Sequence, residues 1–65
     1  MNLPEDGFLL LSVINTKLRD CYFSLEELCA AENLDKNRLL KRLFEIGYAY
    51  DCKLNAFKAV DSRFN

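Results

Sequence analysis

The stretch SLEELCAAENLD, residues 24–35, decides the fold, because it holds the start of one helix and the turn into the next. Ser24 and Glu27 have the spacing of a capping box, in which each side chain bonds a free N–H group at the helix start. Phe23 stands just before the cap, in the position of a hydrophobic staple, and is expected to pack on Leu28. A helix therefore begins directly after Ser24.

This helix is predicted to run from Leu25 to near Glu32, where Asn33 tolerates the left-handed conformation that ends helices. Leu34 then returns to the core, and Asp35 is placed to cap the next helix. A capped short helix, a left-handed turn residue, an apolar residue and a new cap are typical of a helix-turn-helix. The inward-facing residues of the short helix are Leu25, Leu28 and Cys29.

The next helix is predicted to run from Lys36 to Ile46, with Gly47 just past its end. Its pattern is the most amphipathic in the chain, with one apolar arc and one largely basic arc. The apolar arc comprises Leu39, Leu40, Leu43, Phe44 and Ile46. The opposite arc comprises Arg38, Lys41, Arg42 and Glu45.

Upstream of the decisive stretch, Asp6 is an N-cap candidate for a helix from Gly7 to about Asp20. Apolar residues recur in this segment with the helical period of about 100° per residue, opposite a polar arc. The expected core face comprises Leu10, Leu11, Ile14, Leu18 and Cys21.

Downstream, residues 48–51 and 55–60 alternate with a period of two around a short turn at 52–54, which predicts a β-hairpin. The fold class is therefore mostly α with a C-terminal β-hairpin, a three-helix domain like a winged helix-turn-helix. One domain is expected over residues 1–60, and the tail 61–65 is expected to be flexible.

Composition excludes most catalytic classes. The chain has 65 residues, a formal net charge of −1, no histidine and three cysteines. A domain this small rarely encloses a deep cleft, so we predict no enzyme activity, no cofactor and no small-molecule substrate. Cys21, Cys29 and Cys52 lack metal-ligand spacing, which predicts no metal site. The odd cysteine count, the acidic start and the short apolar run at 8–14 predict a cytoplasmic protein without membrane insertion.

Several short blocks of the chain together match a known pattern. They are Leu3-Pro4, Leu10-Leu11-Ser12, the unbroken run from Ile14 to Asp20, Ser24-Leu25, Leu28-Cys29, Ile46-Gly47-Tyr48, Tyr50-Asp51, and Asn55 with Phe57. Through these blocks the chain resembles a family of short bacterial proteins, the domain of unknown function 4250, over about residues 1–58. After Asp6, where members of that family usually have proline, this chain has Gly7. The resemblance implies a bacterial source and a helical domain with a C-terminal hairpin, and it transfers no activity.

The basic arc is the first candidate site, because a recognition helix needs cations that reach phosphates and base edges. Its candidate nucleic-acid-binding residues are Lys36, Asn37, Arg38, Lys41, Arg42 and, at the hairpin turn, Lys53. The alternative is a solvated face whose charges pair locally, Lys41 with Glu45 and others with the acidic second helix. Residues 20–35 indeed hold five acidic and no basic residues, while residues 36–44 hold four basic and no acidic ones.

A second candidate site serves a protein partner. It comprises Asn15, Thr16, Arg19, Tyr22, Tyr48 and Tyr50. Polar groups in mid-helix and aromatic residues near a hairpin are both typical of interfaces. The alternative is structural: Arg19 and Asp20 tie the helix end to the hairpin, and Phe57 with one tyrosine closes the core.

Two functions therefore compete. The first is a nucleic-acid-binding module with DNA as its partner. The second is a protein-interaction or homo-oligomeric module that binds no nucleic acid.

Overall fold

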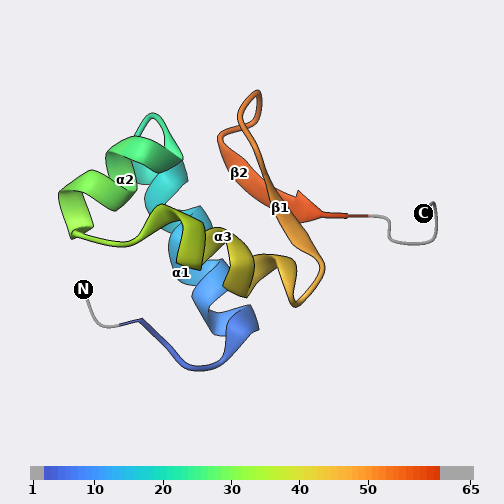
Figure 1. Ribbon diagram of the computed structural model, residues 1–65. Coiled ribbons are helices and arrows are strands. Elements are labelled where there is room, and N and C mark those ends of the chain that lie inside the picture. The colour runs from blue at the N-terminus through green and yellow to red at the C-terminus, as the bar shows by residue number, and fades with distance from the viewer. Residues whose placement is uncertain (1–2, 61–65) are drawn as a thin grey trace.

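The computed structural model describes residues 3–60 of the chain. Three helices precede a two-stranded antiparallel sheet (Figure 1). The elements are α1 (Gly7–Asp20), α2 (Leu25–Glu32), α3 (Lys36–Phe44), β1 (Tyr48–Asp51) and β2 (Ala56–Ala59). The predicted fold class is confirmed, and the arrangement is consistent with a winged helix-turn-helix. The tail predicted at 61–65 lies outside the described residues.

α1 begins where its N-cap was predicted. The Asp6 carboxylate accepts hydrogen bonds from the backbone N–H groups of Phe8 and Leu9 at 2.8 and 3.3 Å, which satisfies two of the four free donors at the helix start. The helix buries one stripe, Leu10, Ile14 and Leu18. Cys21, predicted on this stripe, is exposed because the helix has ended and the backbone at Cys21 leaves the helical conformation.

At the start of α2, the predicted capping residue Ser24 is confirmed, whereas the predicted hydrophobic staple is wrong. The Ser24 hydroxyl accepts from the Glu27 N–H at 3.0 Å, as predicted. The Glu27 carboxylate accepts from the N–H of Phe23 at 3.4 Å, so this interaction holds the Phe23 backbone. The Phe23 ring itself is 91% exposed and fills no staple position. Asn33 ends the helix in the left-handed conformation, with φ 58°.

α3 ends two residues earlier than the pattern predicts. Its last helical residue is Phe44, and Gly47 turns the chain into β1 with φ +86°. Ile46, released from the helix, reaches back to α1, where a Cβ on Gly7 would lie 2.9 Å from its Cγ2. The helical pattern placed Ile46 on the apolar arc of the helix. In the structure Ile46 lies beyond the end of α3, and its side chain packs beside Gly7 of α1. Phe44 was predicted in that arc, and its side chain is 63% exposed.

The hairpin has a longer turn and a shorter second strand than predicted. Tyr48 pairs with Ala59 and Tyr50 with Phe57, which leaves residues 52–55 as the turn. The Asp51 carboxylate accepts from the N–H groups of Lys53 and Leu54 at 2.8 and 3.3 Å, an Asx turn that starts the reversal. Asn55 closes it with φ 52°.

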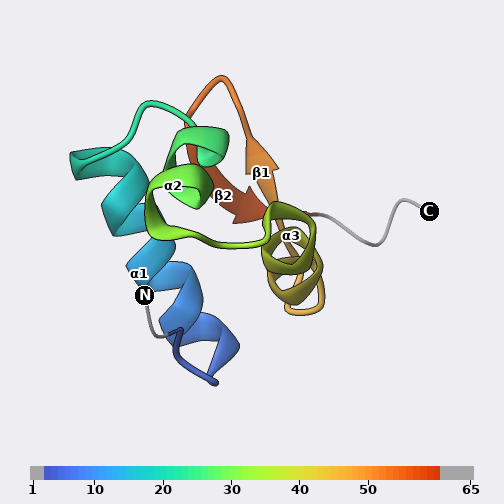
Figure 2. The same cartoon turned by 60° about the vertical axis from the view of Figure 1, so that its left-hand side comes forward.

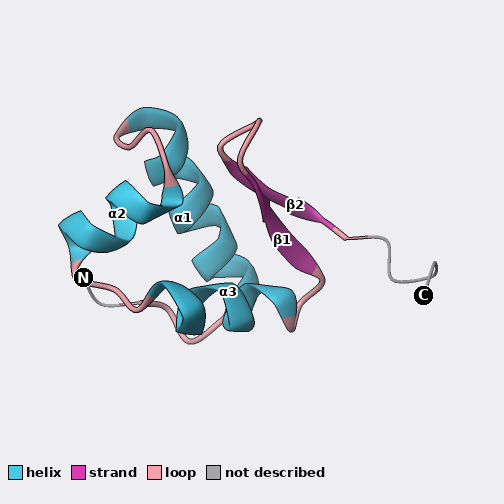
Figure 3. Ribbon diagram, turned by 45° about the horizontal axis from the view of Figure 1, so that its top comes forward, coloured by secondary structure: helices cyan, strands magenta, loops and turns pink. Residues whose placement is uncertain are grey.

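The core lies between the three helices and the inner face of the hairpin. α1 runs through the middle, with α2 on one side, the hairpin on the other and α3 across one end (Figures 1 and 3). The buried members of the core are Leu10, Ile14, Leu18, Leu25, Leu28, Cys29, Leu39, Leu43 and Phe57. Eight of these nine come from the helices, so the hairpin contributes one large anchor, Phe57.

Candidate nucleic-acid interface

α3 is held so that one side stays free. Its N-terminus is capped by Asp35, whose carboxylate accepts from the Arg38 N–H at 3.2 Å. Leu39 and Leu43 are buried and fix the helix against the core. The opposite side lies against none of the other helices or strands described between residues 3 and 60, as the nearly end-on view of the α3 ribbon in Figure 2 shows. We call this side the α3 outer arc; its exposed residues are Asn37, Arg38, Lys41, Phe44 and Glu45.

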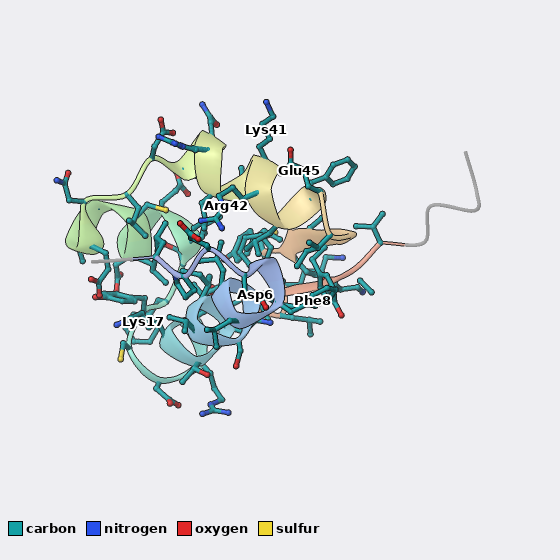
Figure 4. All side chains as sticks on the ribbon, turned by 90° about the horizontal axis from the view of Figure 1, so that it is seen from below. Asp6, Phe8, Lys17, Lys41, Arg42 and Glu45 are labelled. Carbon is teal, nitrogen blue, oxygen red and sulfur yellow. The ribbon has the colours of Figure 1, made fainter. Side chains whose placement is uncertain are left out.

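Two of the predicted nucleic-acid residues on α3 have partners within the fold. The Lys36 ammonium lies 3.8 Å from the Glu26 carboxylate of α2, a long and exposed pair. The Arg42 guanidinium donates through Nη2 to the carbonyls of Pro4 and Glu5, each at 3.0 Å. Figure 4 shows Arg42 turned toward the N-terminal segment that carries Asp6. Arg42 therefore ties that segment to α3.

Arg38 and Lys41 remain as the free cations of the α3 outer arc. Within residues 3–60 neither side chain forms an ion pair or a hydrogen bond. Glu45 lies one turn beyond Lys41, both point away from the body of the molecule in Figure 4, and no ion pair joins them in the described chain. Lys53 is exposed in the hairpin turn, on a separate element. The arc therefore presents two cations and one anion.

Asn15, predicted as a partner residue, holds the hairpin to α1. Its side-chain amide donates to the Phe57 carbonyl at 3.0 Å, and its side-chain oxygen accepts from the Phe57 N–H at 2.7 Å. These two bonds satisfy the backbone edge of β2 as a neighbouring strand would. Asn55 makes the second attachment, donating to the carbonyls of Leu18 and Tyr22 at 3.1 and 2.9 Å.

The other predicted partner residues fall into two groups. Tyr22 and Tyr50 form hydrogen bonds inside the fold, whereas Thr16 and Arg19 are exposed. The Tyr50 hydroxyl donates to the Asn55 side chain at 2.6 Å and accepts from a backbone N–H of α2. Tyr22 also bonds internally. Arg19 bonds its neighbour Asp20 through two N–H groups, at 2.9 and 3.1 Å, on the exposed end of α1. Thr16 is exposed, and Tyr48 packs edge-on against Phe8, with ring centroids 6.4 Å apart.

Tyr22 belongs to a polar tie between α1 and α2. Its hydroxyl donates to the Glu32 carboxylate at 2.8 Å, and the Lys17 ammonium lies 3.3 Å from the same oxygen. The hydrogen bond from Tyr22 and then that from Lys17 lower the pKa of Glu32. The same bond to Glu32, together with burial, raises the pKa of Tyr22. The tie is a structural feature, because its three groups satisfy one another.

Thr16 and Arg19 do line a groove, between α1 and the hairpin turn. The residues that line it are Phe8, Leu11, Ser12, Asn15, Thr16, Leu18, Arg19, Leu54, Asn55 and Ala56. Phe8 and Leu54 are 61% and 64% exposed, and the sequence pattern singled out neither.

Phe44, like Cys21 and Phe23, is exposed where the sequence pattern predicted packing. It follows Asn37 by seven residues, which is two helical turns, and therefore lies above Asn37 on the α3 outer arc. That spacing is the signal by which its exposure was predictable.

The cysteines differ in exposure: Cys29 is buried in the core, whereas Cys21 and Cys52 are exposed. Within residues 3–60 no group of three or more His, Cys, Asp or Glu side chains is placed to hold a metal ion. Burial raises the pKa of the Cys29 thiol, which disfavours the nucleophilic thiolate. In the same range of residues, no helix has the length and apolar character to cross a membrane.

The fold defines a class: a small three-helix domain with a C-terminal hairpin, an arrangement consistent with a winged helix-turn-helix. The chain matches the family model described as Domain of unknown function (DUF4250) over residues 4–57, and it belongs to that family. This confirms the resemblance seen in the sequence blocks. Comparison with curated proteins and comparison with solved structures each find no match.

Proposed function

We propose that the chain is a nucleic-acid-binding module, with DNA as its partner and the α3 outer arc as its contact surface. The observation that carries the proposal is the free state of Arg38 and Lys41. Both are exposed, one helical turn apart, and unpaired within residues 3–60. In a helix-turn-helix the second helix enters the major groove, and α3 holds the corresponding place after α2 and its turn.

The strength of this contact follows from the number of free cations. Each phosphate neutralised contributes about −0.9 to the slope of log affinity against log salt. Two cations give a slope of about −1.8, so a fourfold rise in salt lowers the affinity roughly twelvefold. Lys36 adds to this slope only where a phosphate displaces Glu26. One domain is therefore a weak binder, and several copies on one nucleic acid are needed for high affinity.

Fluorescence anisotropy with labelled mixed-sequence duplex DNA at low salt tests the proposal. Arg38→Gln and Lys41→Gln are each expected to weaken binding and to reduce the salt slope by about 0.9. Lys58→Gln is the matched control, because it removes the same charge from the hairpin, where Lys58 faces Asp51 at 3.5 Å. Equal effects of all three variants indicate net charge alone. Absence of binding at about 100 μM, both to the duplex and to a single strand of the same sequence, overturns the proposal.

The groove between α1 and the hairpin turn favours a second candidate function, self-association without nucleic acid. Phe8 and Leu54 expose most of their side chains at this groove. Burying two such side chains against a second copy removes apolar surface that a chain this small otherwise leaves in water. Sedimentation velocity is expected to show dimers that Leu54→Ser dissociates. A monomer at every concentration rules this function out.

A further inference from the structure

Phe44 adds a feature that a phosphate contact alone does not require. Its ring is 63% exposed, on the same arc as Arg38 and Lys41. Within residues 3–60 the aromatic pairs join Phe8 to Tyr48 and Tyr50 to Phe57, so Phe44 stacks on no other ring there. An unpaired aromatic face thus stands next to two unpaired cations.

The combination matches one class of nucleic acid better than another. Surfaces that bind single strands combine cations that follow the phosphates with aromatic rings on which bases stack. In a duplex the faces of the bases are covered by their neighbours, and a ring on a helix surface meets only base edges and the backbone. A ring beside two phosphate-binding cations therefore gains most from an unpaired base.

We infer that the α3 outer arc binds single-stranded nucleic acid, with Phe44 stacking on one base while Lys41 and Arg38 contact the neighbouring phosphates. This inference rests on the proposed function and specifies its ligand. Lys41 lies one helical turn from Phe44, and Arg38 one turn further, so the three side chains lie in sequence along the helix. Glu45 follows Arg38 by seven residues, two helical turns, and therefore lies on the side of Lys41 opposite to Phe44, where its carboxylate repels phosphates.

The test compares three labelled oligonucleotides of one sequence, about 12 nucleotides long: single-stranded DNA, single-stranded RNA and the DNA duplex. Phe44→Leu keeps an apolar side chain and removes the ring. It is expected to weaken single-strand binding by about 5- to 100-fold, the effect of one lost stacking contact, and duplex binding by less than about twofold. Circular dichroism is expected to show an unchanged fold, because the ring is outside the core.

Phe23→Leu is the matched control. Phe23 is more exposed than Phe44 and lies before α2, away from the α3 outer arc, so its loss is expected to leave affinity unchanged. The RNA and DNA arms show whether the 2′-hydroxyl contributes. Tighter duplex binding, or equal effects of the two Phe variants, overturns the inference while the proposed function stands.

A failure of the proposed function has a different signature. In that case none of the three oligonucleotides binds, with or without Phe44. If Phe44→Leu then dissociates a self-associated form in sedimentation velocity, the arc is a protein interface and both proposals on nucleic acid are wrong.

Discussion

Single asparagine side chains hold the hairpin in place. Asn15 bonds both backbone groups of Phe57, and Asn55 bonds two carbonyls at the end of α1. A two-stranded hairpin has marginal stability by itself, so these attachments and the buried Phe57 side chain keep it folded. At the residue scale, an amide is required at position 15 because it must donate to a carbonyl and accept from an N–H group.

Asn15→Asp tests this requirement. The carboxylate still accepts from the Phe57 N–H but faces the Phe57 carbonyl without a proton to donate. We expect the free energy of unfolding to fall by about 1–3 kcal/mol, the cost of leaving a partly buried acceptor unpaired beside a charge. Thr16→Ala, at the next and exposed position, is expected to change it by less than about 0.5 kcal/mol. Urea denaturation measures both, and equal effects contradict the role of Asn15.

Gly47 is the second residue whose type the backbone requires. Its φ of +86° turns the chain from α3 into β1, and L-residues with a Cβ rarely adopt it. A Cβ there meets no atom within 4 Å, so Gly47→Ala tests backbone conformation without a steric clash. We expect a loss of about 1–2 kcal/mol in thermal or chemical unfolding. An unchanged stability contradicts the strain argument.

At the scale of elements, α1 and α2 are joined by a tie that depends on pH. The Glu32 carboxylate is bonded by Tyr22 and Lys17, and its pKa in the folded protein is lowered. A lowered folded pKa means that the tie contributes stability above the pKa of the unfolded chain. This contribution is lost as the pH falls through the folded value.

The pH dependence of the melting temperature therefore identifies the tie. Between neutral pH and acid, the melting temperature of Glu32→Gln is expected to fall less than that of the wild-type protein. Glu26→Gln is the matched control, because Glu26 is exposed and its pair with Lys36 is 3.8 Å long. A wild-type acid profile in Glu32→Gln means that other carboxylates control the transition.

The stabilisation from the same tie is also lost at alkaline pH. The pKa of Tyr22 is raised in the folded protein, first by its bond to Glu32. A raised folded pKa contributes stability below the unfolded value, and the contribution is lost as the pH rises through the folded one. The α1–α2 tie is therefore strongest between the acid and alkaline transitions of its two members.

At the scale of the whole molecule, the net charge of −1 conceals an uneven distribution. Most acidic residues of the α2 region have internal roles: Glu32 in the tie, Asp35 as a cap and Glu27 at the helix start. Of the four α3 cations, Lys36 and Arg42 have partners within the fold, and the side chains of the other two form no ion pair with residues 3–60. Within residues 3–60, the α3 outer arc is therefore a surface on which two cations remain available to a partner.

Glu45→Gln tests whether the α3 outer arc binds a negatively charged partner. Removing the one anion of the arc is expected to raise the affinity for nucleic acid about two- to fivefold at low salt, an effect that falls as salt screens it. Glu26→Gln removes the same charge on α2 and is expected to have a smaller effect. Anisotropy titrations at two salt concentrations measure both. A decrease in affinity on removing Glu45 is incompatible with a polyanion at the arc.

Local signals predicted most of the elements and their order. Asp6, Ser24, Asn33 and Asp35 each act within a few residues of their own position, and each has its predicted role in the structure. The apolar period located the buried residues of α1 and α2 because a helix that packs on one side must repeat its apolar residues on that side. The family resemblance was equally a property of the chain.

Contacts between distant segments decided which charged groups are paired and which aromatic rings are exposed. Arg42 and Asn15 bond residues 37 to 42 positions away, and no local pattern indicates such partners. Phe23 was assigned to a staple that did not form. Phe44 was assigned to packing by its apolar type, although its spacing from Asn37 places it on the exposed side of α3. Exposure is decided by which elements cover a face, so the packing of the helices and hairpin, rather than the residue pattern, produced the α3 outer arc.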